Sequence, residues 1–121
     1  MNIEELREYC ISIKGASEST PFLDDSVLVF KVMDKMFAYV ALKPKDGIFR
    51  VNMKCIPERS AELREQYPGV ERCANTRSLT WNSIQIESDI PDGLIKELID
   101  HSVAEVIKAL PKKKQEEYHN L

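Results

Sequence analysis

The chain has few of the residues from which metal, disulfide and catalytic sites are built. Its 121 residues include two histidines and three cysteines, at positions 10, 55 and 73, with no CxxC pair. An odd number of widely spaced cysteines argues against a disulfide framework and against a thiolate zinc site. A glycine-rich phosphate loop and a paired acid/base motif are also missing. We therefore expect no cofactor, no metal and no enzymatic activity.

Long apolar runs and a leader-like start are missing as well. The N-terminal stretch is acidic, with Glu4 and Glu5, and lacks the basic and apolar regions of a signal peptide. A content of 43% hydrophobic and 31% charged residues is that of an ordinary globular protein. The length is that of one domain. We expect a single domain over residues 1–121, without a membrane span, monomeric and cytoplasmic.

Three segments have helical patterns. Residues 3–14 carry apolar side chains at helical spacing, and a long apolar stripe runs from Leu94 to Leu110. A short, mostly exposed helix is expected at residues 57–66, because proline suits the first turn of a helix. Residues 112–117 are expected to be a fraying helix end, with His119 in a mobile tail.

The middle of the chain alternates with a period of two. Residues 27–32 and 36–42 predict a β-hairpin, and residues 48–54 and 79–87 predict two further strands. Residues 16–25 have no period and predict an irregular connection, with Phe22 at the core edge. The order of elements favours an α+β fold, with an antiparallel sheet of about five strands covered on one face by the N- and C-terminal helices. The other face would be open to solvent.

Short motifs follow one another along nearly the whole chain. They are Thr20-Pro21-Phe22, Phe30-Lys31-Val32, Lys35-Met36-Phe37-Ala38, Val51-Asn52-Met53-Lys54-Cys55, Pro57-Glu58, Glu62-Leu63-Arg64, Tyr67-Pro68, Trp81-Asn82-Ser83-Ile84, Ile90-Pro91 and His101-Ser102. In this order and spacing they resemble the YjbR-like (MmcQ-like) family of small bacterial proteins. The resemblance implies a frataxin-like (CyaY-like) fold and a DNA-binding role through wing-like strand hairpins.

The chain departs from the family pattern just before the tryptophan. Relatives tend to have a basic, histidine-containing segment there, whereas residues 75–80 of this chain have Arg77 as their one basic residue. If that segment contacts phosphate in relatives, the contact is weaker in this protein.

Positive charge is concentrated in the middle of the chain, although the overall charge is −3. Residues 31–77 hold ten Lys and Arg against six Asp and Glu, a net charge of +4, whereas both flanking parts are acidic. On the third strand, Arg50, Asn52 and Lys54 should project from one face about 6.6–6.8 Å apart, close to two nucleotide steps. The alternative is that these residues are ordinary polar side chains on a solvent-exposed face of the sheet, without a ligand.

DNA is the partner that this distribution and the resemblance favour, bound through its backbone with little sequence preference. Trp81 could stack on a base, or it could be an anchor at the rim of the core. Lys43 and Lys45 could extend the basic surface, or could simply protect the hairpin edge. The predicted contact residues are Lys31, Lys35, Arg50, Asn52, Lys54, Arg77 and Trp81.

Other functions remain as alternatives. A non-enzymatic module that docks a protein or a small ligand would be supported by exposed aromatic side chains around Phe37, Tyr39 and Trp81. We expect His101 to be packed or hydrogen-bonded rather than a catalytic base, and Cys55 to be a small packed residue. A metal site with the carboxylates of Glu4, Glu5 and Glu8 as oxygen ligands is suggested only by the implied frataxin-like fold. The simpler interpretation is that they form the solvent-exposed face of a helix.

Overall fold

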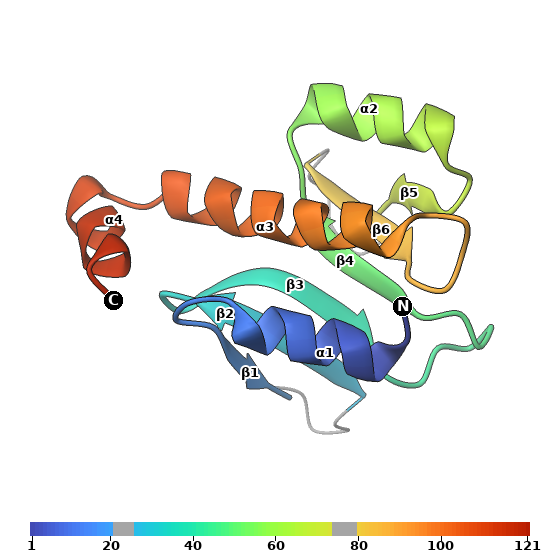
Figure 1. Ribbon diagram of the computed structural model, residues 1–121, viewed down its shortest axis with the longest axis horizontal. Coiled ribbons are helices and arrows are strands. Elements are labelled where there is room, and N and C mark those ends of the chain that lie inside the picture. Colours follow the sequence, from blue (N-terminus) through green and yellow to red (C-terminus); the bar gives the residue numbers. More distant parts are fainter. Residues whose placement is uncertain (21–25, 74–79) are drawn as a thin grey trace.

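The computed structural model describes residues 1–20, 26–73 and 80–121, which form a mixed α and β structure (Figure 1). The helices are α1 Ile3–Ser12, α2 Pro57–Gln66, α3 Asp92–Lys108 and α4 Lys112–His119. The strands are β1 Ser17–Ser19, β2 Val27–Val32, β3 Lys35–Ala41, β4 Arg50–Lys54, β5 Val70–Arg72 and β6 Trp81–Gln85.

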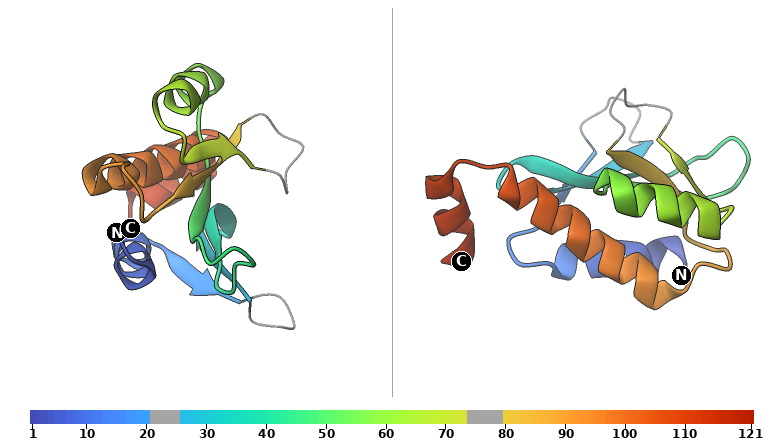
Figure 2. Two further views of the ribbon diagram at one scale, coloured as in Figure 1. Left: turned by 90° about the vertical axis from the view of Figure 1, so that its right-hand side faces the viewer. Right: turned by 90° about the horizontal axis from the view of Figure 1, so that it is seen from above.

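The six strands form one sheet in the order β1-β2-β3-β4-β6-β5, and every neighbouring pair is antiparallel. Helices α1 and α3 lie on the same side of this sheet, and α2 lies beside its β5–β6 end (Figure 2). The predicted fold class is therefore confirmed. The sheet has six strands rather than about five. Strand β1 lies in the segment that was expected to be irregular, and β5 lies between the predicted helix at 57–66 and the predicted strand at 79–87, where no strand was assigned.

Helix α1 begins where the sequence predicts. The Asn2 side chain accepts a hydrogen bond from the Glu5 N–H at 2.8 Å, and the Glu5 carboxylate accepts one from the Asn2 N–H at 3.0 Å. This reciprocal capping box satisfies two of the N–H groups that a helix start leaves unpaired. Gly15, which follows the helix, has a φ of +74°, a backbone conformation that glycine adopts without steric cost.

The β2–β3 hairpin turns through two residues and contains a β-bulge. Met33 and Asp34 have φ angles of +50° and +62°, as a tight two-residue hairpin turn requires. Phe30 pairs with Ala38 and Lys31 pairs with Met36, so Phe37 is an extra residue in β3. The bulge breaks the alternation of side chains. Phe37 therefore enters the core, where its ring centroid lies 6.2 Å from that of Phe30.

The C-terminal segment is a docked helix rather than a fraying end. Helix α4 follows α3 after a break at Pro111, and Tyr118 on α4 is buried. The Tyr118 hydroxyl donates to the Lys14 carbonyl at 2.9 Å. The expectation of a mobile tail at His119 is therefore wrong, because a buried aromatic side chain and a long-range hydrogen bond hold α4 against the start of the chain.

A side chain from α3 bridges β3 and β4 where these strands diverge. Their pairing ends at Ala38 and Met53, so Phe37 and Lys54 do not continue the ladder. The buried Ser102 hydroxyl lies between them. It donates to the Phe37 carbonyl at 2.7 Å and accepts from the Lys54 N–H at 2.9 Å. One hydroxyl group thus satisfies two backbone groups that the open ladder would leave unpaired.

Among the residues that the structure describes, no helix has both the length and the apolar character needed to cross a membrane.

Replacing Ser102 with alanine should lower the free energy of unfolding by about 1–3 kcal/mol, because the Phe37 carbonyl and the Lys54 N–H would lose their partner. The better helix propensity of alanine offsets only about 0.5 kcal/mol of this loss. Urea denaturation measures the difference. The control is Ser12→Ala on the exposed side of α1, which should change stability by less than about 0.5 kcal/mol. Equal stability of both variants would contradict the bridging role.

Candidate nucleic-acid interface

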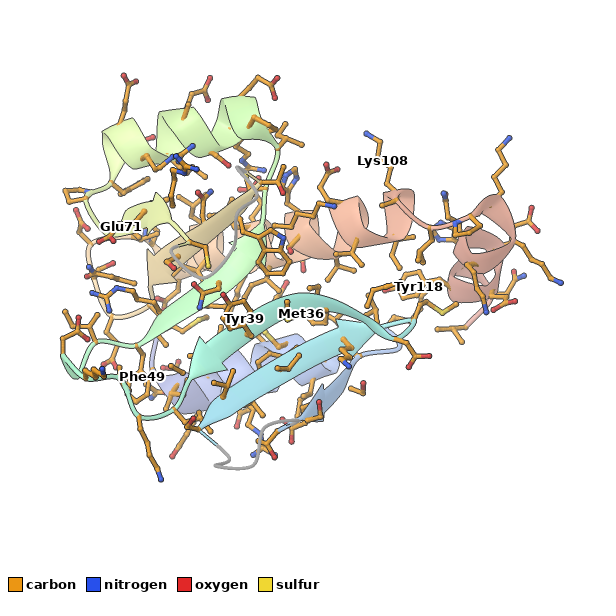
Figure 3. The ribbon with its side chains drawn as sticks, turned by 180° about the vertical axis from the view of Figure 1, so that it is seen from behind. Met36, Tyr39, Phe49, Glu71, Lys108 and Tyr118 are labelled. Carbon is orange, nitrogen blue, oxygen red and sulfur yellow. The ribbon has the colours of Figure 1, made fainter. Side chains whose placement is uncertain are left out.

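The face of the sheet that lies away from α1 and α3 carries the predicted contact residues of β4. Val51 and Met53 belong to the core, whereas Arg50, Asn52 and Lys54 lie on the opposite face, as their alternation predicted. Figure 3 views the molecule from this side, with Met36 and Tyr39 along β3. The three β4 residues have different surroundings, so they do not form one uniform basic row.

Asn52 lies at the centre of a buried polar cluster. Its Oδ1 accepts hydrogen bonds from the Ser83 hydroxyl and from the Cys73 thiol, the latter at 3.3 Å. Its Nδ2 donates to the Tyr39 carbonyl at 3.3 Å. The side chain is only 7% exposed, so the structure places this predicted contact residue inside the sheet surface rather than on it. Asn52 joins strands β3, β4 and β6.

Arg50 is half-buried and has an acidic partner in the preceding loop. Its guanidinium group donates to both carboxylate oxygens of Asp46, at 2.9 and 3.3 Å. This bidentate bond lowers the pKa of Asp46 and raises that of Arg50. The positive charge of Arg50 is therefore largely offset before any ligand arrives.

Three of the predicted lysines have no ion-pair partner within the described ranges: Lys31, Lys35 and Lys54. Lys31 pairs with Met36 across the hairpin, and Lys35 is the residue next to Met36. Lys54 lies on the other side of the opening between β3 and β4. Lys35 and Lys54 line one cleft, whereas Lys31, opposite Met36, points to the other face of the hairpin from Lys35, which lies opposite the buried Val32. We call these three residues, at the hairpin end of the sheet, the lysine corner.

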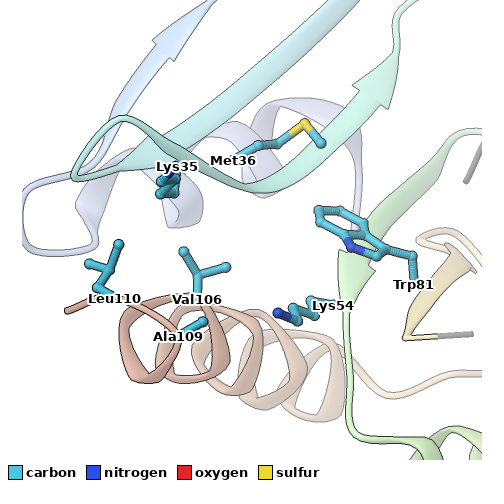
Figure 4. Close-up of a pocket in the computed structure, with 7 residues that line it drawn as sticks. All are labelled: Lys35, Met36, Lys54, Trp81, Val106, Ala109 and Leu110. Carbon is cyan, nitrogen blue, oxygen red and sulfur yellow. The ribbon is translucent and has the colours of Figure 1, made fainter. Parts of the chain in front are cut away.

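A cleft opens within the lysine corner, between the diverging ends of β3 and β4 and helix α3 (Figure 4). Its volume is about 320 Å³, and none of its lining residues is acidic. Trp81 borders it, and Figure 4 shows its ring directed across the opening. The lining residues are Lys35, Met36, Lys54, Trp81, Val106, Ala109 and Leu110.

Trp81 is half-buried and packs against Tyr39, with ring centroids 5.9 Å apart and an interplanar angle of 36°. This is the geometry of a rim anchor, one of the two interpretations of the sequence. Phe37 is completely buried, so it adds no exposed aromatic surface of the kind that the interaction-module hypothesis invoked. Arg77 and Phe22 lie outside the described residues.

His101 and Cys55 have structural partners. His101 Nε2 accepts a hydrogen bond from the Ile56 N–H at 3.3 Å, as expected of a hydrogen-bonded histidine. Cys55 is buried, and burial raises the pKa of its thiol. Within residues 1–20, 26–73 and 80–121, no cluster of three His, Cys, Asp or Glu residues is placed to hold a metal ion.

Sequence reasoning missed the partners that decide which residues are available. Asp46 lies four residues before Arg50, and this spacing could have suggested their pairing. Cys73 and Ser83 gave no comparable sign, because they meet Asn52 only through strand register and long-range packing. Met36 and the α3 residues of the cleft were read simply as parts of a strand and of an apolar stripe.

Replacing Asn52 with alanine should lower the free energy of unfolding by about 1–3 kcal/mol, because the Cys73 thiol and the Ser83 hydroxyl would lose their shared acceptor. Thermal or urea denaturation checks this. Gln85→Ala, on the same face, is the matched control and should change stability by less than about 0.5 kcal/mol. An Asn52→Ala variant as stable as this control would show that the cluster is not structural.

The buried cysteines should react slowly with iodoacetamide in the folded protein. Burial raises the pKa of Cys10 to about 12 and also raises that of Cys55, so little thiolate is present at mildly alkaline pH. Peptide mass spectrometry after timed labelling gives the rate at each cysteine, with the urea-unfolded protein as the control. Labelling of Cys55 at the same rate in folded and unfolded protein would contradict its buried position.

Comparison with known proteins gives a consistent result. The YjbR family model matches residues 11–103. The YjbR proteins of Escherichia coli K12 and O157:H7 are each 30% identical to this chain over 115 residues, which cover 95% of both sequences.

Solved structures are similar as well. The crystal structure of DR2400 from Deinococcus radiodurans, a domain of the DUF419 family model, aligns with 98% of this chain and 88% of its own, at 28% identity and a TM-score of 0.86. A Pseudomonas syringae crystal structure shares the fold at 20% identity and a TM-score of 0.72, covering 84% of this chain and 96% of its own. The family match and the identity to the curated relatives, over almost the full length of both chains, show that the protein belongs to the YjbR family.

Proposed function

We propose that this protein binds DNA through the phosphate backbone, with the lysine corner as its contact surface. The observation that carries the proposal is that Lys35 and Lys54 line one cleft at the hairpin end of the sheet, where Lys31 lies opposite the cleft residue Met36. None of these three lysines has an ion-pair partner in the described part of the chain. A lysine without an ion-pair partner can neutralise a DNA phosphate and release its bound counterion without first breaking an ion pair within the protein. Such lysines therefore contribute most to phosphate binding.

The distribution of the other charges supports this location. Arg50 is paired with Asp46 and Asn52 is buried, so the middle of β4 offers little to a phosphate. Lys43 and Lys45 follow β3, at the end of that strand remote from Lys35. The acidic side chains Glu4, Glu5 and Glu8 are on α1, which covers the opposite face of the sheet. DNA would therefore approach the hairpin end of the sheet, at the opening between β3 and β4.

Backbone contacts of this kind discriminate poorly between sequences. Lysine is a compact point charge without the planar fork with which arginine reads guanine. We therefore propose binding with little sequence preference and a strong dependence on salt.

Fluorescence anisotropy with labelled DNA at several salt concentrations tests the proposal. Changing Lys31, Lys35 and Lys54 together to glutamine should weaken binding, and each lost phosphate contact should reduce the slope of log affinity against log salt by about 0.7 to 0.9. The matched control changes Lys43, Lys45 and Lys96 to glutamine, which alters the net charge equally but should leave affinity within about twofold of the wild type at physiological salt. Equal losses in both triple variants, or no DNA binding at low salt, would overturn the proposal.

A further inference from the structure

We propose that the cleft between β3, β4 and α3 is a nucleotide subsite, in which Trp81 stacks on an unpaired base while Lys35 and Lys54 bind its phosphate. The inference rests on the proposed function and specifies its ligand as a single-stranded or terminal nucleotide rather than a paired one. A free mononucleotide offers the same chemistry as one residue of a DNA strand, so the experiment below separates these two sources.

The cleft is held open by the fold. Beyond Ala38 and Met53 the ladder of β3 and β4 does not continue, and the Ser102 hydroxyl occupies the position between the Phe37 carbonyl and the Lys54 N–H. Closing the strands would require removing this hydroxyl and its two hydrogen bonds. A ligand therefore enters an opening that already exists, as in most small-molecule sites, and no strand has to separate when it binds.

The wall on one side of the cleft suits a planar ring. Trp81 borders it, and the packing of its ring against Tyr39 fixes the ring orientation. Met36 approaches from β3 and supplies a flexible, polarizable thioether that can adapt to an inserted ring. Aromatic platforms of this kind bind bases of any sequence, because every base has a π face.

The other lining residues suit the phosphate and the remainder of the ligand. Lys35 and Lys54 come from the two separated strands, one on each side of the opening, and neither has an ion-pair partner in the described residues. Val106, Ala109 and Leu110 form an apolar floor. A ligand with one planar ring and one anionic group matches this combination, whereas an inorganic anion would leave the aromatic and apolar parts unused.

The C-terminal end of α3 lies at this floor, and its carbonyl groups would by themselves disfavour an anion. Gln115 of α4 reduces this effect. Its Nε2 donates to the Leu110 carbonyl at 2.8 Å and to the Lys108 carbonyl at 3.3 Å. Two of the carbonyl groups at the end of α3 are therefore already hydrogen-bonded within the protein.

The size of the cleft favours an unpaired nucleotide. A volume of about 320 Å³ lies at the lower end of the range for small-molecule pockets, which is roughly 300–1,000 Å³. A base inside a duplex is stacked and paired, and reaching the cleft would require flipping it out. Single strands and strand ends should therefore bind more tightly than blunt duplex.

Trp81 is the one tryptophan of the chain, so its fluorescence reports directly on the subsite. The experiment titrates the protein with thymidine monophosphate, thymidine, inorganic phosphate and a short oligothymidine. We expect saturable quenching of Trp81 fluorescence by the monophosphate and by the oligonucleotide, and no quenching by phosphate alone. Thymidine should bind about tenfold or more weakly than the monophosphate, because it lacks the phosphate that contacts the lysines.

Variants assign the two halves of the site. Trp81→Leu should weaken the binding of labelled oligothymidine, measured by anisotropy, roughly fivefold to a hundredfold. Trp81→Phe should retain most of the wild-type affinity. Lys35→Gln combined with Lys54→Gln should remove monophosphate quenching, whereas Lys43→Gln combined with Lys45→Gln should not. Circular dichroism checks that each variant is folded. If Trp81→Leu does not fold, Trp81→Phe still allows the test to be made.

The outcomes separate this inference from the proposed function. In one outcome, DNA binding responds to the lysine changes, Trp81 fluorescence stays constant, and the Trp81→Phe and Trp81→Leu variants bind DNA equally well. This outcome would overturn the subsite and leave backbone binding intact. Quenching by the monophosphate without affinity for any DNA would support the subsite as a site for free nucleotides and overturn the proposed function. No response to any ligand would reject both.

Discussion

The hydroxyl group of Ser102 is the contact on which the arrangement of the candidate site depends. It satisfies Phe37 and Lys54 at the point where β3 and β4 part, and so stabilises an opening that a regular sheet would not have. The bulge at Phe37 contributes to the same local geometry, because it directs this side chain into the core and leaves Met36 at the cleft. Two departures from a regular ladder thus place lysines from two strands around one aromatic ring.

Charge alone does not identify this surface. The basic middle of the chain is distributed over several elements, and partners within the fold remove part of it. Asp46 offsets Arg50, and Glu97 of α3 pairs with Arg59 of α2. Among the lysines without an ion pair in the described residues, Lys35 and Lys54 line the opening in the sheet. The candidate site is therefore defined by the coincidence of unpaired cations with a permanent cleft, and less by the number of basic residues nearby.

Local patterns predicted much of the fold. The hairpin, the helix at residues 57–66 and the two faces of β4 follow from spacing, turn residues and proline placement, all of which act over a few residues. Strand β1 was missed because Ser-Glu-Ser has no apolar alternation and forms only by pairing with β2. Helix α4 was misread because its docking depends on Tyr118 reaching Lys14. The same holds for the site. Lys35, Lys54 and Trp81 were named from the sequence, but the cleft that they line depends on contacts to Ser102 that no local pattern encodes.

The central claim is that ligand binding is localised at the opening between β3 and β4. The most direct test is a titration with short single-stranded DNA followed by two-dimensional ¹⁵N–¹H NMR spectra. The account predicts that the Trp81 indole signal and the backbone signals of Lys35, Met36 and Lys54 shift together and saturate, while those of α1 and of the loop after β3 stay in place. Shifts that are centred on the Arg50 end of β4, or spread evenly over the surface, would contradict it.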